Sequence, residues 1–456
     1  MDWERFYATL PVPLQEAAVS VEGWRIRRQR YNRVFHRLLA EYRARETWTQ
    51  EAVVAWRHQR LTAFIAHAAR TVPYYRDLFR ELGATPEDFR TLEDVRRLPV
   101  LDKRTVQEQP ERFVSEAVPR RATQRCHTSG TTGAGLHFIA TIDSQREHWA
   151  VWWRYRAWHG LAPDEPCLYF GGRSIVPATQ QRPPFWRRNR PGRQVLFSGY
   201  HLSPAHAPAY LDAMRRSGAR WIHGYPSMVA LIAGYALELG VSLPMRWVTL
   251  GAENVLPQQA DLITRAFGVR PRSHYSMAEG VANISECPEG CHHLDEDFAA
   301  VELLPIPGSD ACRILGVNLS NPAFPLIRYD TGDLAVPSGE SCPCGRPGRL
   351  VAAIDGRDEN YVVTKSGARL GRLDHIFKDM VRVREAQIRQ ARPGHMELRV
   401  VRGPGYSTED EAALRAETRK RVGDDMDFDI VYVDALPRAA SGKLRFVVSE
   451  TVREKQ

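Results

Sequence analysis

The sequence predicts an α/β protein, with a large N-terminal domain of mostly parallel sheets flanked by helices and a small α+β C-terminal domain. The chain of 456 residues is too long for one ordinary hydrophobic core. Between residues 100 and 330, short apolar runs alternate with helical stretches, as in the βαβ units that build parallel sheets. The pattern changes over the last hundred residues. We therefore expect domains at 1–356 and 357–456, the second mobile.

The N-terminal part, residues 1–72, is predicted to be helical. Val54, Leu61, Ile65 and Ala68 recur at helical spacing, and Pro73 ends the run. The apolar stripe of this segment needs a partner, so we expect it to pack on the large domain. These helices could also form the surface of a homodimer.

The alternating part contains a predicted strand at 247–250 and predicted helices at 226–239 and 258–267. Residues 176–195 are rich in Pro, Arg and Gln, which favours a long loop or lid near a site.

In the C-terminal part, residues 386–390 and 396–401 are expected to be strands around a Pro-Gly turn, and 427–433 another strand. Thr408 and Glu411 can form the capping box of a helix that ends near Arg421.

Composition is typical of a globular protein, with 43% hydrophobic and 26% charged residues. We see no apolar run of the roughly 20 residues that span a bilayer and no secretion signal, so we expect a cytoplasmic location and no membrane span. The net charge of +9 is spread along the chain rather than gathered in one stripe. This distribution suits small anionic substrates better than nucleic acid, which we do not expect as a partner.

The clearest chemical signal is the run His-Thr-Ser-Gly-Thr-Thr-Gly at residues 127–133. Its glycines let backbone N–H groups approach an anion, and its hydroxyls add uncharged donors. Such a loop can hold the phosphates of a nucleotide, although it lacks the Gly-Lys-Ser/Thr of a Walker A loop. By itself it could equally be a polar surface turn.

Four further motifs follow in order. Residues 274–279 place a carboxylate four positions after an aromatic ring, which suits base stacking and Mg²⁺ binding. Residues 328–333 end in a carboxylate after a Thr-Gly turn, which can accept hydrogen bonds from ribose. Residues 356–358 could be a hinge, and 437–444 a loop that presents one lysine. Alone, each could be an ordinary junction, turn or surface loop.

Together these five motifs resemble the adenylate-forming superfamily over about residues 60–450. The chain is most similar to the phenylacetate–coenzyme A ligase branch and its capsule-biosynthesis-associated (CapK-type) relatives. Features of that branch are Gly-Ala-Glu at 251–253, Cys-Pro-Cys-Gly-Arg at 342–346 and Glu-Ala-Gln-Ile-Arg-Gln at 385–390.

The resemblance implies a two-step reaction. A carboxylate attacks the α-phosphorus of ATP, giving an acyl-adenylate and pyrophosphate, and an acceptor then takes the acyl group. The acid is expected to be aromatic or arylacetic and the acceptor coenzyme A. An amine or hydroxyl acceptor is the alternative, as is a nucleotide-binding homologue with reduced catalysis.

The resemblance also assigns roles by motif position. Lys443, Glu279 and Thr131 would be catalytic, with Lys443 bridging the carboxylate and the α-phosphate, Glu279 binding Mg²⁺, and Asp358 serving as the hinge. The residues expected to bind ATP are Ser129, Gly130, Thr131, Thr132 and Gly133 for the phosphates, Tyr275 and Glu253 for adenine, and Asp333 and Arg357 for ribose.

The chain departs from the family pattern at two positions. Ala134 stands where the phosphate loop usually has lysine, and Ala278 precedes the Mg²⁺ carboxylate where Ser or Thr is usual. Phosphate affinity could be weaker as a result, or Arg173 and the arginines of 187–193 could compensate.

Seven cysteines, an odd number, argue against a disulfide framework. Cys287, His293, Cys342 and Cys344 form our predicted structural zinc site of three thiolates and one imidazole, and Cys291 or His292 could replace the second ligand. The alternative is a set of reduced buried thiols.

Overall fold

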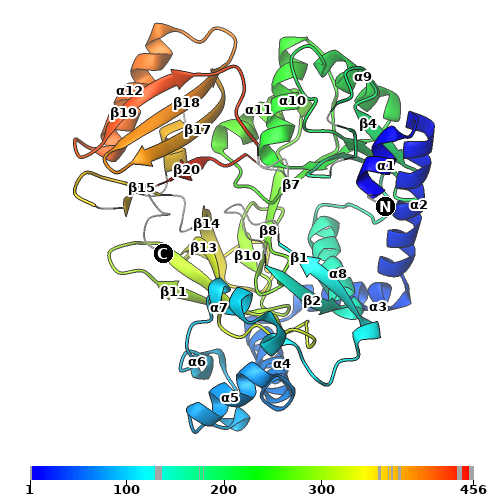
Figure 1. Ribbon diagram of the computed structural model, residues 1–456, viewed down its shortest axis with the longest axis vertical. Coiled ribbons are helices and arrows are strands. Elements are labelled where there is room, and N and C mark those ends of the chain that lie inside the picture. The colour runs from blue at the N-terminus through cyan, green and yellow to red at the C-terminus, as the bar shows by residue number, and fades with distance from the viewer. Residues whose placement is uncertain are drawn as a thin grey trace. The chain divides into compact units, whose positions relative to one another are not determined.

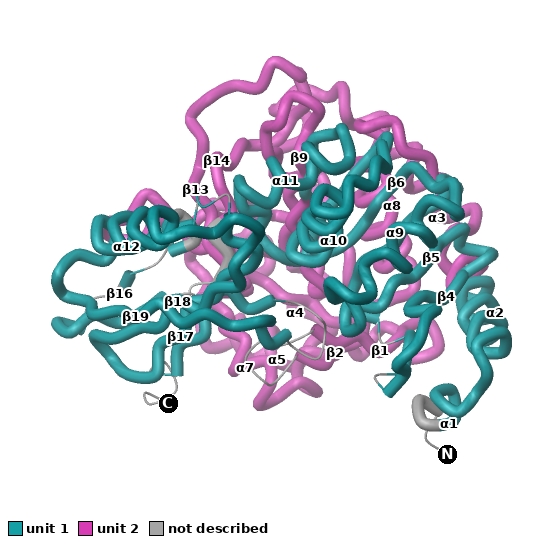
Figure 2. The backbone as a smooth tube through the Cα atoms, turned by 90° about the horizontal axis from the view of Figure 1, so that it is seen from above, with its two compact units in different colours: residues 1–25, 164–273, 357–456 teal, residues 26–163, 274–356 magenta. Residues whose placement is uncertain are grey.

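The computed structural model describes residues 3–128, 136–173, 175–177, 179–357, 361–367, 369–370, 373–377, 380, 382–438 and 444–450. The chain forms two compact units, shown in different colours in Figure 2. Unit 1 combines residues 1–25, 164–273 and 357–456, and unit 2 combines 26–163 and 274–356. The C-terminal part, which we expected as a separate domain from residue 357, is thus grouped with residues 164–273.

Residues 3–71 are largely helical. The elements are α1 (Trp3–Thr9), α2 (Val12–Arg30), α3 (Arg33–Ala44), a 3₁₀ turn (Arg45–Thr47) and α4 (Gln50–Thr71). Thr49 caps α4 by accepting a hydrogen bond from the Ala52 N–H at 3.2 Å. Leu61, Ile65 and Ala68 of the predicted stripe are buried in the core of unit 2.

The rest of unit 2 surrounds a sheet with the strand order β11-β12-β13-β14-β10-β9-β8. These strands are β8 (Arg272–Ser276), β9 (Asn283–Glu286), β10 (His292–Leu294), β11 (Ala300–Pro305), β12 (Cys312–Val317), β13 (Tyr329–Pro337) and β14 (Leu350–Arg357). A separate hairpin joins β1 (Thr123–His127) and β2 (His137–Thr141). The helices are α5 (Pro73–Glu81), α6 (Leu92–Val95), α7 (Lys103–Glu108) and α8 (Ile142–Trp158).

Parallel pairing lies in unit 1, where the strand order is β7-β6-β3-β5-β4. β3 (Cys167–Phe170), β5 (Gln194–Phe197), β6 (Trp221–Gly224) and β7 (Trp247–Gly251) pair in parallel, linked through α9 (Ala207–Ser217) and α10 (Pro226–Glu238). α11 (Pro257–Phe267) follows β7. The α/β class and the predicted elements at 226–239, 247–250 and 258–267 are confirmed. In unit 2, by contrast, β8 and β9, β9 and β10, β10 and β14, β11 and β12, and β12 and β13 pair antiparallel. All of these pairs except β10 and β14 are successive strands, whose connections are too short for the crossover that parallel pairing needs.

The prediction of one long loop at 176–195 is wrong in its second half. β4 (Trp186–Asn189) pairs antiparallel with β5, and the Asn189 side chain closes the turn by accepting from the Gly192 N–H at 3.1 Å. The sequence pattern did not predict this strand because of the arginines at 187, 188 and 190. A strand with an inward-facing arginine lacks the usual alternation of apolar and polar residues.

The C-terminal part has its own core within residues 362–447. Its sheet has the order β19-β18-β17-β20, and α12 (Thr408–Val422) lies across the face of β17, β18 and β19 (Figure 1). The strands are β17 (Val383–Arg392), β18 (His395–Arg402), β19 (Asp427–Tyr432) and β20 (Val447–Ser449), preceded by β15 (Val362–Val363), β16 (Arg369–Leu370) and a 3₁₀ turn (Leu373–Phe377).

The capping box of α12 differs from our prediction by one residue. Ser407 is the N-cap and exchanges hydrogen bonds with Asp410, whereas we expected Thr408 with Glu411. Both pairs have the same spacing, so the sequence pattern alone does not separate them.

None of the helices within the described residues is long and apolar enough to cross a membrane.

Candidate functional site

Two predicted nucleotide-binding residues of unit 2 are in direct contact. The Tyr275 hydroxyl, at the end of β8, donates a 2.7 Å hydrogen bond to Asp333 Oδ2 in β13. Burial and the neighbouring carboxylate raise the pKa of Tyr275 well above its usual range, so the hydroxyl keeps its proton. The aromatic ring expected at adenine and the carboxylate expected at ribose therefore form one pair, although 58 residues separate them.

The backbone around Asp333 is held in a tight local turn. Gly332 has a positive φ of 71°, which glycine adopts without steric cost. Its N–H donates to Asp330 Oδ1, and the Asp333 N–H donates to Thr331 Oγ1, both at 3.0 Å. This turn lies inside β13.

The turn after Tyr275 is fixed by two residues of α8 that the sequence did not reveal. Trp152 Nε1 donates to Ser276 Oγ at 2.9 Å, and His148 Nε2 lies 2.9 Å from the same oxygen. Burial lowers the pKa of His148 to about 4, so its ring is neutral near pH 7. The spacing of four residues places both side chains on one face of α8, but no sequence signal connects that face to Ser276.

Glu279, the expected Mg²⁺ ligand, is buried and follows this turn. Its main-chain carbonyl accepts a 3.3 Å hydrogen bond from Asn318 Nδ2, which also donates to the Phe324 carbonyl. A single carboxylate cannot specify a metal by itself, so Mg²⁺ binding by Glu279 remains a prediction.

Several predicted residues lie outside the described part of the chain: Ser129, Gly130, Thr131, Thr132, Gly133, Ala134, Asp358 and Lys443. The backbone of Arg357 ends β14, and its side chain is not described. The residues flanking the phosphate loop are described. Thr128 and Leu136 exchange two hydrogen bonds, at 2.8 and 3.0 Å, just beyond the β1–β2 pairing. The predicted loop therefore connects the strands of a hairpin.

Glu253, which we expected near adenine, binds two backbone amides within unit 1. Its carboxylate accepts from the Ser227 N–H at the start of α10 and from the Leu444 N–H, each at 3.0 Å. The preceding Ala252 has a φ of 70°, a left-handed conformation that is uncommon for residues other than glycine. The adenine contact of Glu253 remains a prediction.

Arg187 cannot supply the missing phosphate contact that we considered for it. Its guanidinium is fully buried in unit 1 and donates to the side chains of Gln15 and Gln180 and to the carbonyls of Pro184 and Trp186. These bonds satisfy the guanidinium within the fold. This residue is a structural link between α2 and β4.

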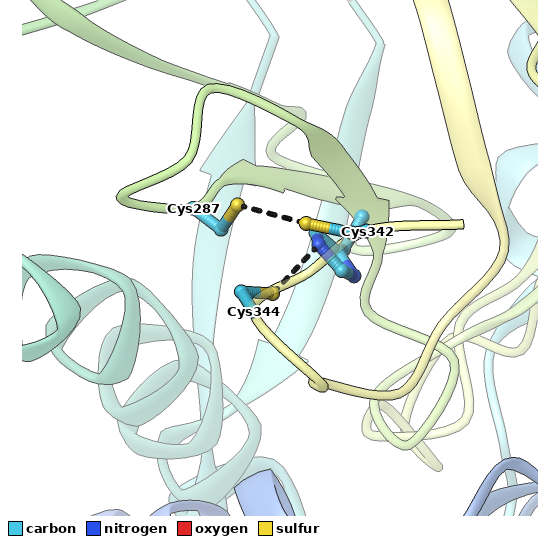
Figure 3. A group of neighbouring side chains, drawn as sticks. Cys287, Cys342 and Cys344 are labelled. Atoms are coloured by element: carbon cyan, nitrogen blue, oxygen red, sulfur yellow. Dashed lines mark hydrogen bonds between the residues drawn. The ribbon is translucent and has the colours of Figure 1, made fainter. Parts of the chain in front are cut away.

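The predicted metal ligands of unit 2 converge. The ligand atoms of Cys287, His293, Cys342 and Cys344 all lie within 4.8 Å of one another. The close-up in Figure 3 shows the three labelled cysteine side chains gathered around one point. Cys287 Sγ is 3.6 Å from Cys342 Sγ, and Cys344 Sγ is 3.4 Å from His293 Nε2. A tetrahedral zinc ion with bonds of about 2.0–2.3 Å separates its ligand atoms by roughly 3.5–3.8 Å. The donor set and these two distances therefore fit zinc.

Local structure prepares these ligands. Cys287 follows β9, and Gly290, with a φ of 88°, turns the chain back into β10, which carries His293. The His293 Nδ1 lies 3.1 Å from the Pro347 carbonyl, which directs Nε2 toward the thiols. All seven cysteines are free of disulfides.

The two alternative ligands are not part of this group of four. His292 points to Glu286, with Nε2 at 4.0 Å from its carboxylate. Adjacent residues of a strand point to opposite faces, which explains why His293 rather than His292 reaches the thiols. Cys291 is half-buried, and its carbonyl accepts from the Cys287 N–H at 2.8 Å.

Helix α8 connects the cysteine cluster with the Tyr275 turn. Beyond His148 and Trp152, its Arg154 is buried and bonds Asp295 at 2.6 Å and Asp297 at 2.7 Å, just after His293. The Arg346 guanidinium, next to Cys344, lies 4.9 Å from the ring centroid of Trp158 at the end of the same helix.

Comparison with known proteins agrees with this architecture. Residues 362–450 match the family model of the CapK C-terminal domain. The chain is 21% identical to protein CapK of Staphylococcus aureus, over 97% of this chain and 98% of that protein. It is 27% identical to phenylacetate–coenzyme A ligase of Thermus thermophilus, over 82% of this chain and 83% of that protein. Its fold resembles that of 2-hydroxyisobutyryl-CoA ligase in the postadenylation state, with a TM-score of 0.69 and 20% sequence identity. The match covers 89% of this chain and 91% of that one.

The fold and the sequence similarity thus define an AMP-forming ligase of the adenylate-forming superfamily. Within that superfamily, the chain is similar over most of its length to the branch that contains the phenylacetate–coenzyme A ligases and the CapK-type proteins.

Proposed function

We propose that this protein uses ATP to convert a carboxylic acid to its acyl-adenylate and then transfers the acyl group to coenzyme A. In the first step, a carboxylate oxygen bonds to the α-phosphorus and pyrophosphate leaves. In the second, the thiol displaces AMP. The mixed anhydride with AMP makes the acyl carbon reactive, which a free carboxylate is not.

The observation that carries the proposal is the hydrogen bond between Tyr275 and Asp333. It joins the ring expected to stack on adenine and the carboxylate expected to bind ribose. Stacking by the ring and acceptance of hydroxyl hydrogens by the carboxylate would bind the nucleoside from two directions.

An aromatic or arylacetic acid is the proposed substrate. Support comes from the similarity to phenylacetate–coenzyme A ligases, including that of Escherichia coli at 24% identity over 70% of this chain.

A second candidate reaction uses the same adenylate but an amine or hydroxyl acceptor. It is favoured by the match of residues 362–450 to the CapK C-terminal domain, because this part of the chain matches a family model that is not one of coenzyme A ligases. The alignment with CapK also covers nearly the whole chain.

We include two metals in the proposal. A zinc ion would be held by Cys287, His293, Cys342 and Cys344. Four protein ligands leave no open coordination position for substrate, so the role of this ion would be structural: it would tie two loops together. Glu279 would contribute to Mg²⁺ binding, and that ion would neutralise phosphate charge.

A cytoplasmic location agrees with the use of ATP and coenzyme A. A homodimer remains part of the proposal, and Leu14, Val21 and Trp24 of α2 are exposed apolar residues that could contribute to its surface.

Acid-dependent exchange of pyrophosphate into ATP, measured over a panel of aromatic and aliphatic acids, tests the first step. Exchange should fall by orders of magnitude in Lys443→Ala, because a cation that stabilises the transferring group is lost. Absence of exchange with every acid would instead support a nucleotide-binding protein without catalysis. Coenzyme A, amines and alcohols offered with the active acid then identify the acceptor.

A further inference from the structure

The loop that carries Lys443 is closed at its base. Arg438 and Leu444 form an antiparallel bridge, so the residues on either side of the loop are paired. Gln387 Nε2 donates to the Arg445 carbonyl and the Ile388 N–H to the Phe446 carbonyl, both at 2.8 Å. The base of the loop is therefore attached to β17. Lys443 itself lies outside the described residues and directly precedes Leu444 in the sequence.

Glu253 connects the Leu444 side of this base to α10. One carboxylate oxygen accepts from Leu444 N–H, and the other accepts from Ser227 N–H in the first turn of the helix. A carboxylate is favoured there because the first N–H groups of a helix have no partners within it and carry partial positive charge. The same side chain thus satisfies α10 and holds the residue next to Lys443.

Arg438 makes the matching connection on the other side of the base. Its guanidinium donates to Ser227 Oγ at 2.8 Å and forms an ion pair with Glu385 of β17. The side chains of Arg438 and Glu385 are only 15% and 10% exposed. Loss of one partner from such a sheltered pair leaves the other charge without compensation, which is costly.

A second ion pair lies on the adjoining surface of α10. Arg384 of β17 pairs with Glu238, and its guanidinium lies 5.1 Å from the ring centroid of Tyr235. β17 therefore contacts α10 through several side chains, so the loop base is attached to this helix by more than the single hydrogen bond of Leu444.

We propose that Glu253, Arg438, Glu385 and Ser227 form an anchor that positions Lys443 for the adenylation step and that is not needed for acyl transfer. The inference rests on the proposed function, which gives Lys443 a role only in the first half-reaction. Fixing both ends of a loop reduces the conformational entropy that its side chains lose when they reach the reacting geometry. Arg438, Glu385 and Ser227 are positioning residues, since none of them is predicted to touch substrate. Glu253 would position Lys443 through the Leu444 backbone, in addition to its predicted place near adenine.

The two half-reactions separate this role from a general structural one. Arg438→Ala and Glu253→Ala should lower phenylacetate-dependent ATP–pyrophosphate exchange by about 10- to 100-fold. Transfer from supplied phenylacetyl-adenylate to coenzyme A should change less than twofold. Glu450→Gln is the matched control, because Glu450 pairs with Arg389 on the exposed part of the same strand, at 2.9 Å. It should leave both half-reactions unchanged.

A charge exchange adds a specific rescue. Arg438→Glu and Glu385→Arg should each impair exchange, and the double variant should recover at least tenfold over either one, because it restores an opposite-charge pair. An equal loss in both half-reactions, or no recovery in the double variant, would overturn the proposal.

Hydrogen–deuterium exchange tests the anchor independently of any activity measurement. The Leu444 amide should exchange at least tenfold faster in Glu253→Ala than in the wild type, and at the wild-type rate in Glu450→Gln. Unchanged protection in Glu253→Ala would refute the anchor. If the wild type shows no pyrophosphate exchange with any acid while this protection is lost as expected, the proposed function fails and the anchor stands.

Discussion

Cys344 Sγ lies 3.4 Å from His293 Nε2, although 51 residues separate them in the sequence. Cys287 and Cys342, 3.6 Å apart, complete the group. Without a metal, burial raises the pKa of both Cys287 and Cys342 to about 11, so these thiols would be protonated near pH 7. A zinc ion would replace those protons and hold the β9–β10 turn against the 342–346 loop.

We therefore expect purified protein to contain close to one zinc per chain, measured by elemental analysis after dialysis. Cys344→Ser should lose most of the metal and lower the thermal midpoint, because a structural zinc contributes directly to folding. Cys126→Ser, a half-buried thiol outside the group, should retain it. A metal-free wild type of full stability would contradict the zinc assignment.

Tyr275→Phe should raise the KM for ATP about tenfold with a smaller effect on kcat. The variant keeps the ring but removes the hydrogen bond to Asp333, and a bond to a charged acceptor contributes about 1.5–3 kcal/mol. Tyr432→Phe is the matched control, because that hydroxyl donates to the Glu411 carboxylate at 2.6 Å on the surface of the small domain. Equal effects of both substitutions on KM would argue against a nucleotide site at Tyr275.

The stability of unit 2 should decrease as the pH falls from about 6.5 to about 4. The pKa of His148 is lowered by burial to about 4, so in this window the unfolded chain binds a proton that the folded chain does not. The maximum contribution is about 3 kcal/mol, fully present above pH 6.5. Urea unfolding as a function of pH should show a shallower loss for His148→Gln than for the wild type. Identical slopes would mean that His148 does not titrate in this way.

Arg154→Met should destabilise the protein by about 3–5 kcal/mol, since it leaves Asp295 and Asp297 buried without their cation. Arg265→Met, which removes an exposed helical pair with Asp261 at 3.7 Å, should cost less than about 1 kcal/mol. Denaturant midpoints measure both. A small effect at Arg154 would show that the two aspartates take up protons or water at little cost.

Much of the fold and part of the site could be predicted because their signals are local. The helix at 226–239 and the strand at 247–250 follow from apolar periodicity, and the cysteine- and histidine-rich runs at 287–293 and 342–344 indicate a metal site through residue type and spacing. The strand at 186–189 could not be recognised, because Arg187 is buried through partners as distant as Gln15. Similarly, nothing local selects Ser407 over Thr408 as the cap of α12.

The sequence by itself determined which chemical groups are available and in what order: hydroxyls and glycines, then carboxylates, thiols and a late lysine. Only the tertiary structure decided which of these groups meet. It paired Tyr275 with Asp333, selected His293 over His292, and brought Glu253 to the backbone beside Lys443. The physical reason is that hydrogen bonds and metal sites need atoms within a few ångströms, and such distances between remote residues come from packing, which local patterns do not encode.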